Sequence, residues 1–103
     1  MEIDKYAAID IGSNAVRMLI TNVIKIEGSV YFRKNSLIRV PIRLGEDSFT
    51  SGEISKKNKN RLIDSIKAFK LLMEVHNVKN YLAYATSALR EATNGQKVVK
   101  EIK

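Results

Sequence analysis

The sequence has no cysteine, one proline, one histidine and few aromatic residues, which make up 7% of its 103 residues. Without cysteine the chain can form neither a disulfide nor a cysteine-based zinc site, and nothing points to an oxidising compartment. The histidine, His76, has no histidine or cysteine partner at ligand spacing, so we interpret it as a surface residue at the end of a helix. No run of about 18 apolar residues is present, and the acidic Met1–Lys5 lacks the apolar segment of a signal peptide. We therefore expect a cytoplasmic protein with no membrane span.

The composition is that of a globular protein with an excess of positive charge. Hydrophobic residues make up 45% of the chain and charged residues 28%, which argues against a disordered tail. The length allows one domain or part of one, and we treat residues 1–103 as a single unit. The 18 Lys and Arg outweigh the 11 Asp and Glu, which gives a net charge of +7. Such a balance attracts nucleic acid, polyphosphate or an anionic membrane surface without selecting among them.

The first third of the chain predicts three antiparallel strands. Strand patterns cover Tyr6–Ile11, Ala15–Ile26 and Val30–Val40, with a short turn at residues 27–29. Pro41 ends or distorts the third strand, because proline cannot donate a hydrogen bond to the ladder. The second strand has apolar residues on both faces, which indicates that both sides of the sheet are partly covered.

A long helix and a fourth strand follow. Gly45–Gly52 is expected to be a loop, and Ser55 is a suitable N-cap for the helix after it. Tyr81–Ala85 is predicted to be a short strand. The helix between them spans about 20 residues, because one apolar stripe continues over that length. The stripe comprises Leu62, Ile66, Phe69 and Met73.

A second helix is predicted at Ala88–Thr93, stopped by Asn94-Gly95, with a further amphipathic turn over residues 96–103. The resulting order, β-β-β-α-β-α, describes a mixed α/β layer structure in which a helix links three antiparallel strands to a parallel fourth strand. A fifth strand should follow the second helix, and the sequence ends before supplying it.

Asp10-Ile-Gly-Ser-Asn14 is the most informative motif, since it places a carboxylate at a strand end directly before a tight polar turn. Gly12 is expected to allow this turn through a positive φ. The amides of Gly12, Ser13 and Asn14 can then face an anion, with Asp10 beside them to hold a hydrated divalent cation. The alternative is an ordinary hairpin turn with a solvated carboxylate, and the pentapeptide alone does not decide between the two.

Thr86–Gly95 repeats this logic at another strand end. Ser87 and the first free amides of the predicted helix would form an anion-binding N-terminus. Arg90 falls in the first turn, where its guanidinium can fork onto phosphate oxygens although its charge opposes the helix dipole. The alternative is a surface ion pair between Arg90 and Glu91.

Several segments, in the right order, resemble the Ppx/GppA family of exopolyphosphatases and guanosine pentaphosphate phosphohydrolases. Ala8–Arg17 resembles the first phosphate loop of that family, and Arg43–Glu46 and Ser51–Ser55 resemble the segment before its first long helix. Thr86–Gly95 is similar to its next strand-end block. The resemblance implies an α/β fold with an RNase H-like lobe of the actin-like ATPase superfamily, in which the sheet order is 3-2-1-4-5.

The resemblance also implies a metal-dependent phosphatase. It would release the terminal phosphate of inorganic polyphosphate or the 5′ γ-phosphate of guanosine pentaphosphate. Its small-molecule partners would then be inorganic polyphosphate or guanosine pentaphosphate/tetraphosphate. Asp10 would position Mg²⁺ (or Mn²⁺) through water, and Arg43 would either contact substrate or lock the preceding loop onto the sheet. The other residues carried over from the family would bind substrate phosphate, and they are Gly12, Ser13, Asn14, Arg17, Ser87 and Arg90.

In the family that this chain resembles, the catalytic base is a glutamate just after the fifth strand. Neither Glu91 nor Glu101 matches that position, so no catalytic residue is expected before Lys103. A second phosphate loop and a second lobe would also follow. We therefore expect an N-terminal fragment that does not turn over substrate alone and that works with the missing C-terminal part of the enzyme.

Two other classes of function stay open at this stage. A nucleic-acid or general polyanion-binding module fits the positive charge, although no RNP-like aromatic run is present and Tyr81 and Tyr84 are expected to pack in the sheet. A non-catalytic interaction module fits the open sheet edge expected at Tyr81–Ala85, where a second copy could pair to form a homodimer.

Overall fold

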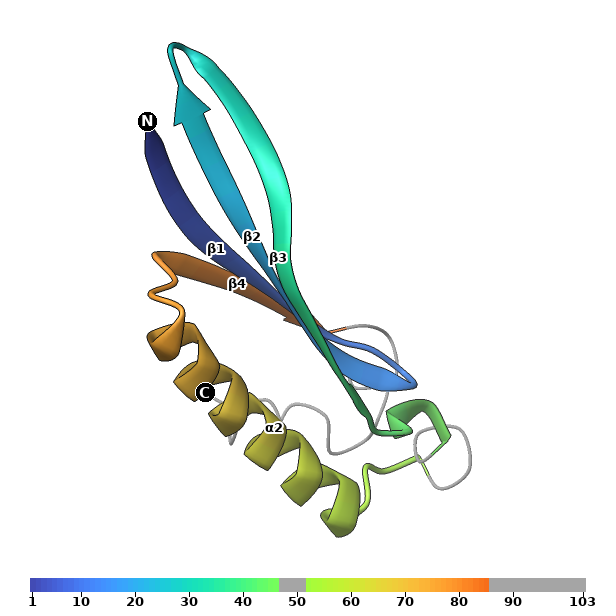
Figure 1. Cartoon of the computed structure of the whole chain (residues 1–103). Helices are drawn as coiled ribbons and strands as arrows, with labels where there is room; N and C mark the ends of the chain where they lie inside the picture. Colours follow the sequence, from blue (N-terminus) through green and yellow to red (C-terminus); the bar gives the residue numbers. More distant parts are fainter. Residues whose placement is uncertain (47–51, 86–103) are drawn as a thin grey trace.

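The computed structural model describes residues 1–46 and 52–85 (Figure 1). The elements, in chain order, are β1 (Glu2–Ile11), β2 (Ala15–Ile26), β3 (Ser29–Pro41), α2 (Lys56–Val75) and β4 (Asn80–Ala85). The strands form one sheet of order β3-β2-β1-β4, in which β1 pairs with β2 and β2 with β3 in antiparallel fashion. β4 lies parallel to β1, so α2 is the crossover that the sequence predicts. The predicted mixed α/β arrangement is therefore confirmed for the described residues.

The strand boundaries differ from the predicted ones mainly at the start of the chain. β1 begins at Glu2, four residues before the predicted Tyr6, because the polar start of the chain pairs with the far end of β2. Figure 1 shows the β2–β3 hairpin extending beyond α2. Its turn has positive φ at Glu27 (45°) and Gly28 (82°), the combination that a two-residue turn of type I′ requires. β3 ends at Pro41, as predicted.

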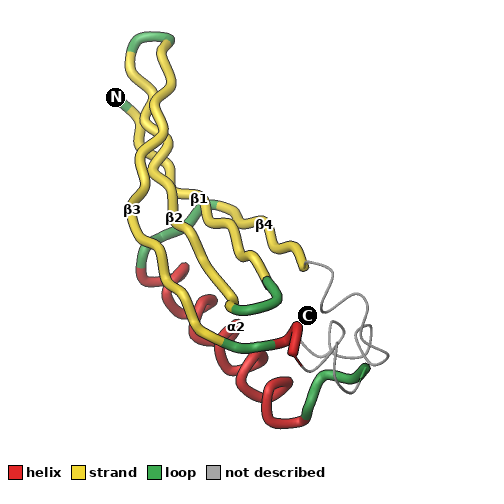
Figure 2. The backbone as a smooth tube through the Cα atoms, turned by 90° about the vertical axis from the view of Figure 1, so that its right-hand side faces the viewer, coloured by secondary structure: helices red, strands yellow, loops and turns green. Residues whose placement is uncertain are grey.

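One face of the sheet packs against α2, as the tube view from the side shows (Figure 2). The predicted apolar stripe is confirmed, since α2 buries Leu62, Ile66, Phe69 and Met73. The sheet supplies alternate residues, which are Ala7, Ile9 and Ile11 of β1 and Val16, Met18 and Ile20 of β2. Burial of such side chains contributes about 1.5–3 kcal/mol each. The core thus lies between α2 and the centre of the sheet.

The ends of α2 are fixed by local hydrogen bonds. Ser55 is the N-cap, and its hydroxyl accepts a hydrogen bond from the amide of Asn58 at 3.2 Å. His76 is the C-cap, which confirms its predicted place at the end of the helix. Arg61 donates to the carbonyl of Pro41 at 2.8 Å and ties the helix to the end of β3. Within the described residues, no helix is both long and apolar enough to cross a bilayer.

The face of the sheet turned away from α2 is here called the far face. Because side chains alternate along a strand, Asp10 of β1 points away from the helix while its neighbours Ile9 and Ile11 are buried. Leu19 of β2 is only half-buried on the far face, in line with the predicted partial cover. The far face therefore presents the polar residues at the carboxyl end of β1.

Two expectations need correction and others fall outside the described residues. Tyr81 and Tyr84 are 51% and 50% exposed rather than packed, because β4 is the edge strand of the described sheet. Residues 45–46, expected in a loop, belong to a helical turn at residues 44–46. The predicted helix at residues 88–93, together with Ser87 and Arg90, lies outside the described residues.

Candidate functional site

A polar pocket of about 360 Å³ lies at the connection between β1 and β2. Its walls come from the carboxyl end of β1, from the loop at residues 12–14 and from the adjoining residues of β2 and β3. The lining residues are Asp10, Gly12, Ser13, Asn14, Ala15, Arg17 and Arg39. The candidate site residues of the first motif therefore line one cavity, together with Arg17.

Backbone hydrogen bonds hold the loop in place. The amide of Gly12 donates to the carbonyl of Ala15 at 2.9 Å and closes the turn. The amide of Gly45 donates to the carbonyl of Ser13 at 2.9 Å, and the amide of Ile42 donates to the carbonyl of Asn14 at 3.2 Å. The segment after β3 thus supports the loop from the outside, through its backbone.

This hydrogen-bonding pattern leaves two loop amides for a ligand instead of three. The Gly12 amide is engaged within the turn, which corrects the expectation that it faces an anion. The amides of Ser13 and Asn14 donate to no described residue, and both residues line the pocket. Two adjacent free amides in a turn are a suitable site for an anionic oxygen.

The reason for a glycine at position 12 also differs from the expected one. Positive φ among the described glycines occurs at Gly28 and Gly52, so Gly12 does not need a left-handed conformation. A Cβ at Gly12 would lie 3.0 Å from the carbonyl oxygen of Ala15, the same oxygen that the Gly12 amide contacts. A side chain at position 12 would therefore have to displace the Ala15 carbonyl, which the Gly12 amide holds in place.

Replacing Gly12 by alanine should therefore loosen the loop. We expect Gly12→Ala to lower the free energy of unfolding by about 1–3 kcal/mol, the usual cost of inserting a methyl group where there is no room. Urea denaturation measures the change. Ser13→Ala is the matched control, because the neighbouring side chain forms no hydrogen bond with a described residue. Equal stability of the two variants would contradict this account of Gly12.

Asp10 and Arg17 form an ion pair across the pocket. The two residues lie directly opposite each other on β1 and β2, which places both side chains on the far face. Arg17 Nη2 donates to Asp10 Oδ2 at 3.1 Å. The carboxylate is 21% exposed and the guanidinium 51%, so the anion sits deeper than the cation. The pairing keeps the carboxylate oriented toward the loop.

The second oxygen of the same carboxylate has no partner. Asp10 Oδ1 is buried and forms no hydrogen bond with any described residue. A buried carboxylate oxygen without a partner is costly, and a cation or its water would remove that cost. The described residues hold no cluster of three potential metal ligands, and Asp10 is the one carboxylate that they contribute to this pocket. This fits Mg²⁺, which keeps several waters and is bound through one or two carboxylates and the substrate phosphates.

Arg39 is the lining residue that sequence reasoning missed. It lies on β3 directly opposite Arg17 of β2, so both guanidinium groups belong to the far face. In the sequence it is one of several basic residues of a strand, and only the register shows its neighbour. The alternation of side chains along β3 could have shown that Arg39 lies on the same face of the sheet as the loop, but not that it lines the same cavity.

Arg43 does not join the pocket. Its Nη1 lies 3.5 Å from Glu46 Oε2, and both side chains are exposed. Of the two roles considered for Arg43, the described contacts assign neither to its side chain. The backbone amides of Ile42 and Gly45, on either side of Arg43, hold the loop instead.

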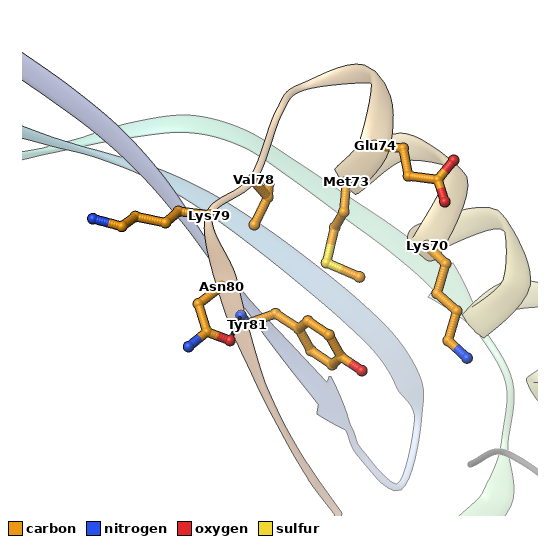
Figure 3. A pocket seen from close by; sticks show the side chains of 7 residues that line it. All are labelled: Lys70, Met73, Glu74, Val78, Lys79, Asn80 and Tyr81. Carbon is orange, nitrogen blue, oxygen red and sulfur yellow. Dashed lines mark hydrogen bonds between the residues drawn. The ribbon is translucent and has the colours of Figure 1, made fainter.

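Another cavity, of about 350 Å³, lies between the carboxyl end of α2 and the start of β4 (Figure 3). Its centre is apolar, with Met73 and the ring of Tyr81 between helix and strand. Its two lysines diverge, because Lys79 points away from Lys70 and pairs with Asp4 at 3.5 Å. Polar groups that converge on one point mark a binding site, so the pocket beside Asp10 is the better candidate.

Comparison with known proteins identifies the family of this chain. The model of the Ppx/GppA phosphatase family matches residues 24–103. The chain belongs to the Ppx/GppA phosphatase family. Its sheet and crossover helix are part of an actin-like ATPase fold, the fold of the family's solved structures.

Individual relatives and structures cover nearly all of the chain. A bifunctional 3-dehydroquinate synthase/phosphatase from Fusobacterium nucleatum is 31% identical over 97% of this chain, and exopolyphosphatase 1 from Mycobacterium bovis is 27% identical over 96%. The crystal structure of a family member from Aquifex aeolicus superposes with a TM-score of 0.88 at 26% identity over 99% of this chain. An exopolyphosphatase from Cytophaga hutchinsonii gives 0.81 at 27% identity over 97%.

The relatives are much longer than this chain. It spans 16% of the Fusobacterium protein and 28% of the Mycobacterium one. It covers 32% of the Aquifex chain and 31% of the Cytophaga chain. The chain therefore corresponds to part of a larger protein in each of these relatives.

Proposed function

We propose that this chain supplies the first phosphate-binding loop of a phosphatase that removes the terminal phosphate from inorganic polyphosphate. Guanosine pentaphosphate is the alternative substrate, since its 5′ γ-phosphate is also held by a phosphoanhydride bond. The observation that carries the proposal is the buried Asp10 Oδ1, which lies beside the amides of Ser13 and Asn14; none of these three groups has a hydrogen-bond partner among the described residues. Carboxylate, amides and arginine together offer ligands to both a hydrated cation and a phosphate.

The residues of the pocket can divide the work of phosphoryl transfer. Transfer to water needs mainly positioning and neutralisation of the charge that spreads over the phosphate oxygens. The amides of Ser13 and Asn14 would each donate a hydrogen bond to a phosphate oxygen, and Arg17 would neutralise charge on the far-face side. Asp10 would hold a hydrated Mg²⁺ through the water shell of the ion, and the ion would supply positive charge to the phosphate.

The base that activates water has to come from outside the described residues. Among residues 1–46 and 52–85, Asp10 is the only carboxylate that lines this pocket, and Arg17 holds one of its oxygens at 3.1 Å. An ion-paired carboxylate assigned to the cation is poorly placed to take a proton as well. We propose that a glutamate in the part of the family fold that follows supplies the base, and that the chain alone is inactive.

The test is phosphate release from polyphosphate and from guanosine pentaphosphate, with and without Mg²⁺. It compares this chain with a protein extended by the downstream coding sequence. We expect phosphate release only from the extended protein, and only when the metal is present. The rates with the two substrates then show which one the protein prefers. No release from either protein, together with salt-sensitive binding to RNA, would refute the phosphatase and favour a polyanion-binding module.

A further inference from the structure

Two arginines face each other across neighbouring strands at the edge of the candidate site. Arg17 of β2 and Arg39 of β3 are direct partners in the register, and both line the pocket. Like charges placed directly opposite each other destabilise a sheet. Nothing in the packing of the described residues requires this arrangement, because both side chains lie away from the core between α2 and the sheet.

The single carboxylate of the pocket compensates only one of these charges. Asp10 pairs with Arg17, its own cross-strand partner. Arg39 forms no hydrogen bond or ion pair with any described residue, and it lies one strand further from Asp10. The pocket therefore keeps one uncompensated positive charge, on the side away from the carboxylate.

The order across the sheet gives that charge a defined place relative to the loop. Adjacent strands are about 4.8 Å apart, so Arg39 is held one strand spacing beyond Arg17. A phosphate on the amides of Ser13 and Asn14 would have Arg17 beside it, and Arg39 would meet the next group of an extended anion. A guanidinium suits this contact, because its fork of donors matches two phosphate oxygens.

We propose that Arg39 contacts the second phosphate of the substrate and makes the site select phosphoanhydride chains over single phosphate groups. The inference rests on the proposed function and adds to it the residue that distinguishes phosphoanhydride chains from single phosphate groups. Arg39 is a binding residue in this assignment, and the bond that breaks lies nearer the loop. Loss of the Arg39 side chain should weaken binding of a diphosphate unit and leave binding of orthophosphate nearly unchanged.

The experiment measures binding of inorganic pyrophosphate and of orthophosphate by calorimetry in the presence of Mg²⁺. The wild-type extended protein is compared with Arg39→Ala and with Arg33→Ala, which removes the same charge from the same strand about 20 Å away. We expect Arg39→Ala to weaken pyrophosphate binding about tenfold, as loss of a charge-assisted contact does, and orthophosphate binding less than twofold. Equal affinities in Arg39→Ala and Arg33→Ala would overturn the proposal.

A second variant and a melting curve guard against misfolding. Arg39→Lys keeps the charge and loses the fork, so it should bind pyrophosphate with an affinity between those of the wild type and Arg39→Ala. Wild-type affinity in Arg39→Lys would exclude a forked contact. Removing the charge opposite Arg17 should leave the melting temperature unchanged or raise it, because repulsion is relieved.

The outcome separates this inference from the proposed function. Phosphate release from polyphosphate that is equal in wild type, Arg39→Ala and Arg33→Ala would reject the role of Arg39 and retain the phosphatase. Absence of release from the wild-type extended protein would reject both.

Discussion

Replacing Asp10 with asparagine should lower the rate of phosphate release by the complete enzyme about 10²–10³-fold, the usual cost of losing one preorganised electrostatic contact. Asparagine has the shape of aspartate, so the loop and the cross-strand position next to Arg17 are retained. What is lost is the negative charge whose free oxygen, Oδ1, faces the site without a partner. The rate is measured with polyphosphate at saturating Mg²⁺.

Asp4→Asn is the matched control for this variant. Asp4 lies on the same strand and the same face as Asp10, and it is also ion-paired, with Lys79 at 3.5 Å. The charge of Asp4 raises the pKa of Lys79, so the lysine remains an ammonium group and the pair is comparable. Asp4 is absent from the pocket lining, and we expect its variant to keep a rate within about twofold of wild type. If the two variants lose activity equally, the loss reflects a general need for negative charge on β1.

The largest effect on stability is expected for Phe69→Ala, which should lower the free energy of unfolding by about 3–5 kcal/mol. Phe69 is among the largest fully buried side chains, and it lies on the α2 stripe that covers the centre of the sheet. The substitution would leave a cavity in the core between α2 and the residues of β1 and β2. Because whole domains are stable by only about 5–15 kcal/mol, the variant should lose much of its folded population on warming.

Leu71→Ala provides the comparison on the same helix. Leu71 is 63% exposed, so removing its side chain leaves no cavity. We expect a change within about 0.5 kcal/mol, as for ordinary surface substitutions. Urea denaturation followed by circular dichroism measures both variants. A similar midpoint for Phe69→Ala and Leu71→Ala would show that α2 does not form the core described here.

The elements of the fold were predictable because their patterns are local. The stripe that Leu62 and Phe69 belong to has the period of a helix, and the structure buries the stripe as expected. β2 extends over the predicted range, Ala15–Ile26, because its apolar alternation is long and a turn follows. The start of β1 was missed, since Glu2 and its polar neighbours gain strand structure only by pairing with the hairpin.

The candidate site was predictable in its residue types and only partly in its geometry. The motif from Asp10 to Asn14 indicates a site for an anion and a hydrated cation, because turn amides bind the anion and a carboxylate binds the cation. Which amides are free depended on the hydrogen bond that closes the turn and on the segment at Ile42 and Gly45 that supports it. The predictions for Ser87 and Arg90 stay predictions, since both lie outside the described residues.

The sequence by itself determined the alternation of the strands, the apolar face of α2 and the polar loop at the end of β1, because each depends on residues close together in the chain. Only the tertiary structure decided that Asp10 pairs with Arg17 and that Arg39 stands opposite Arg17. It also decided that Gly12 is needed for lack of space. These features depend on strand register and on contacts between segments distant in sequence, and neither has a local signature.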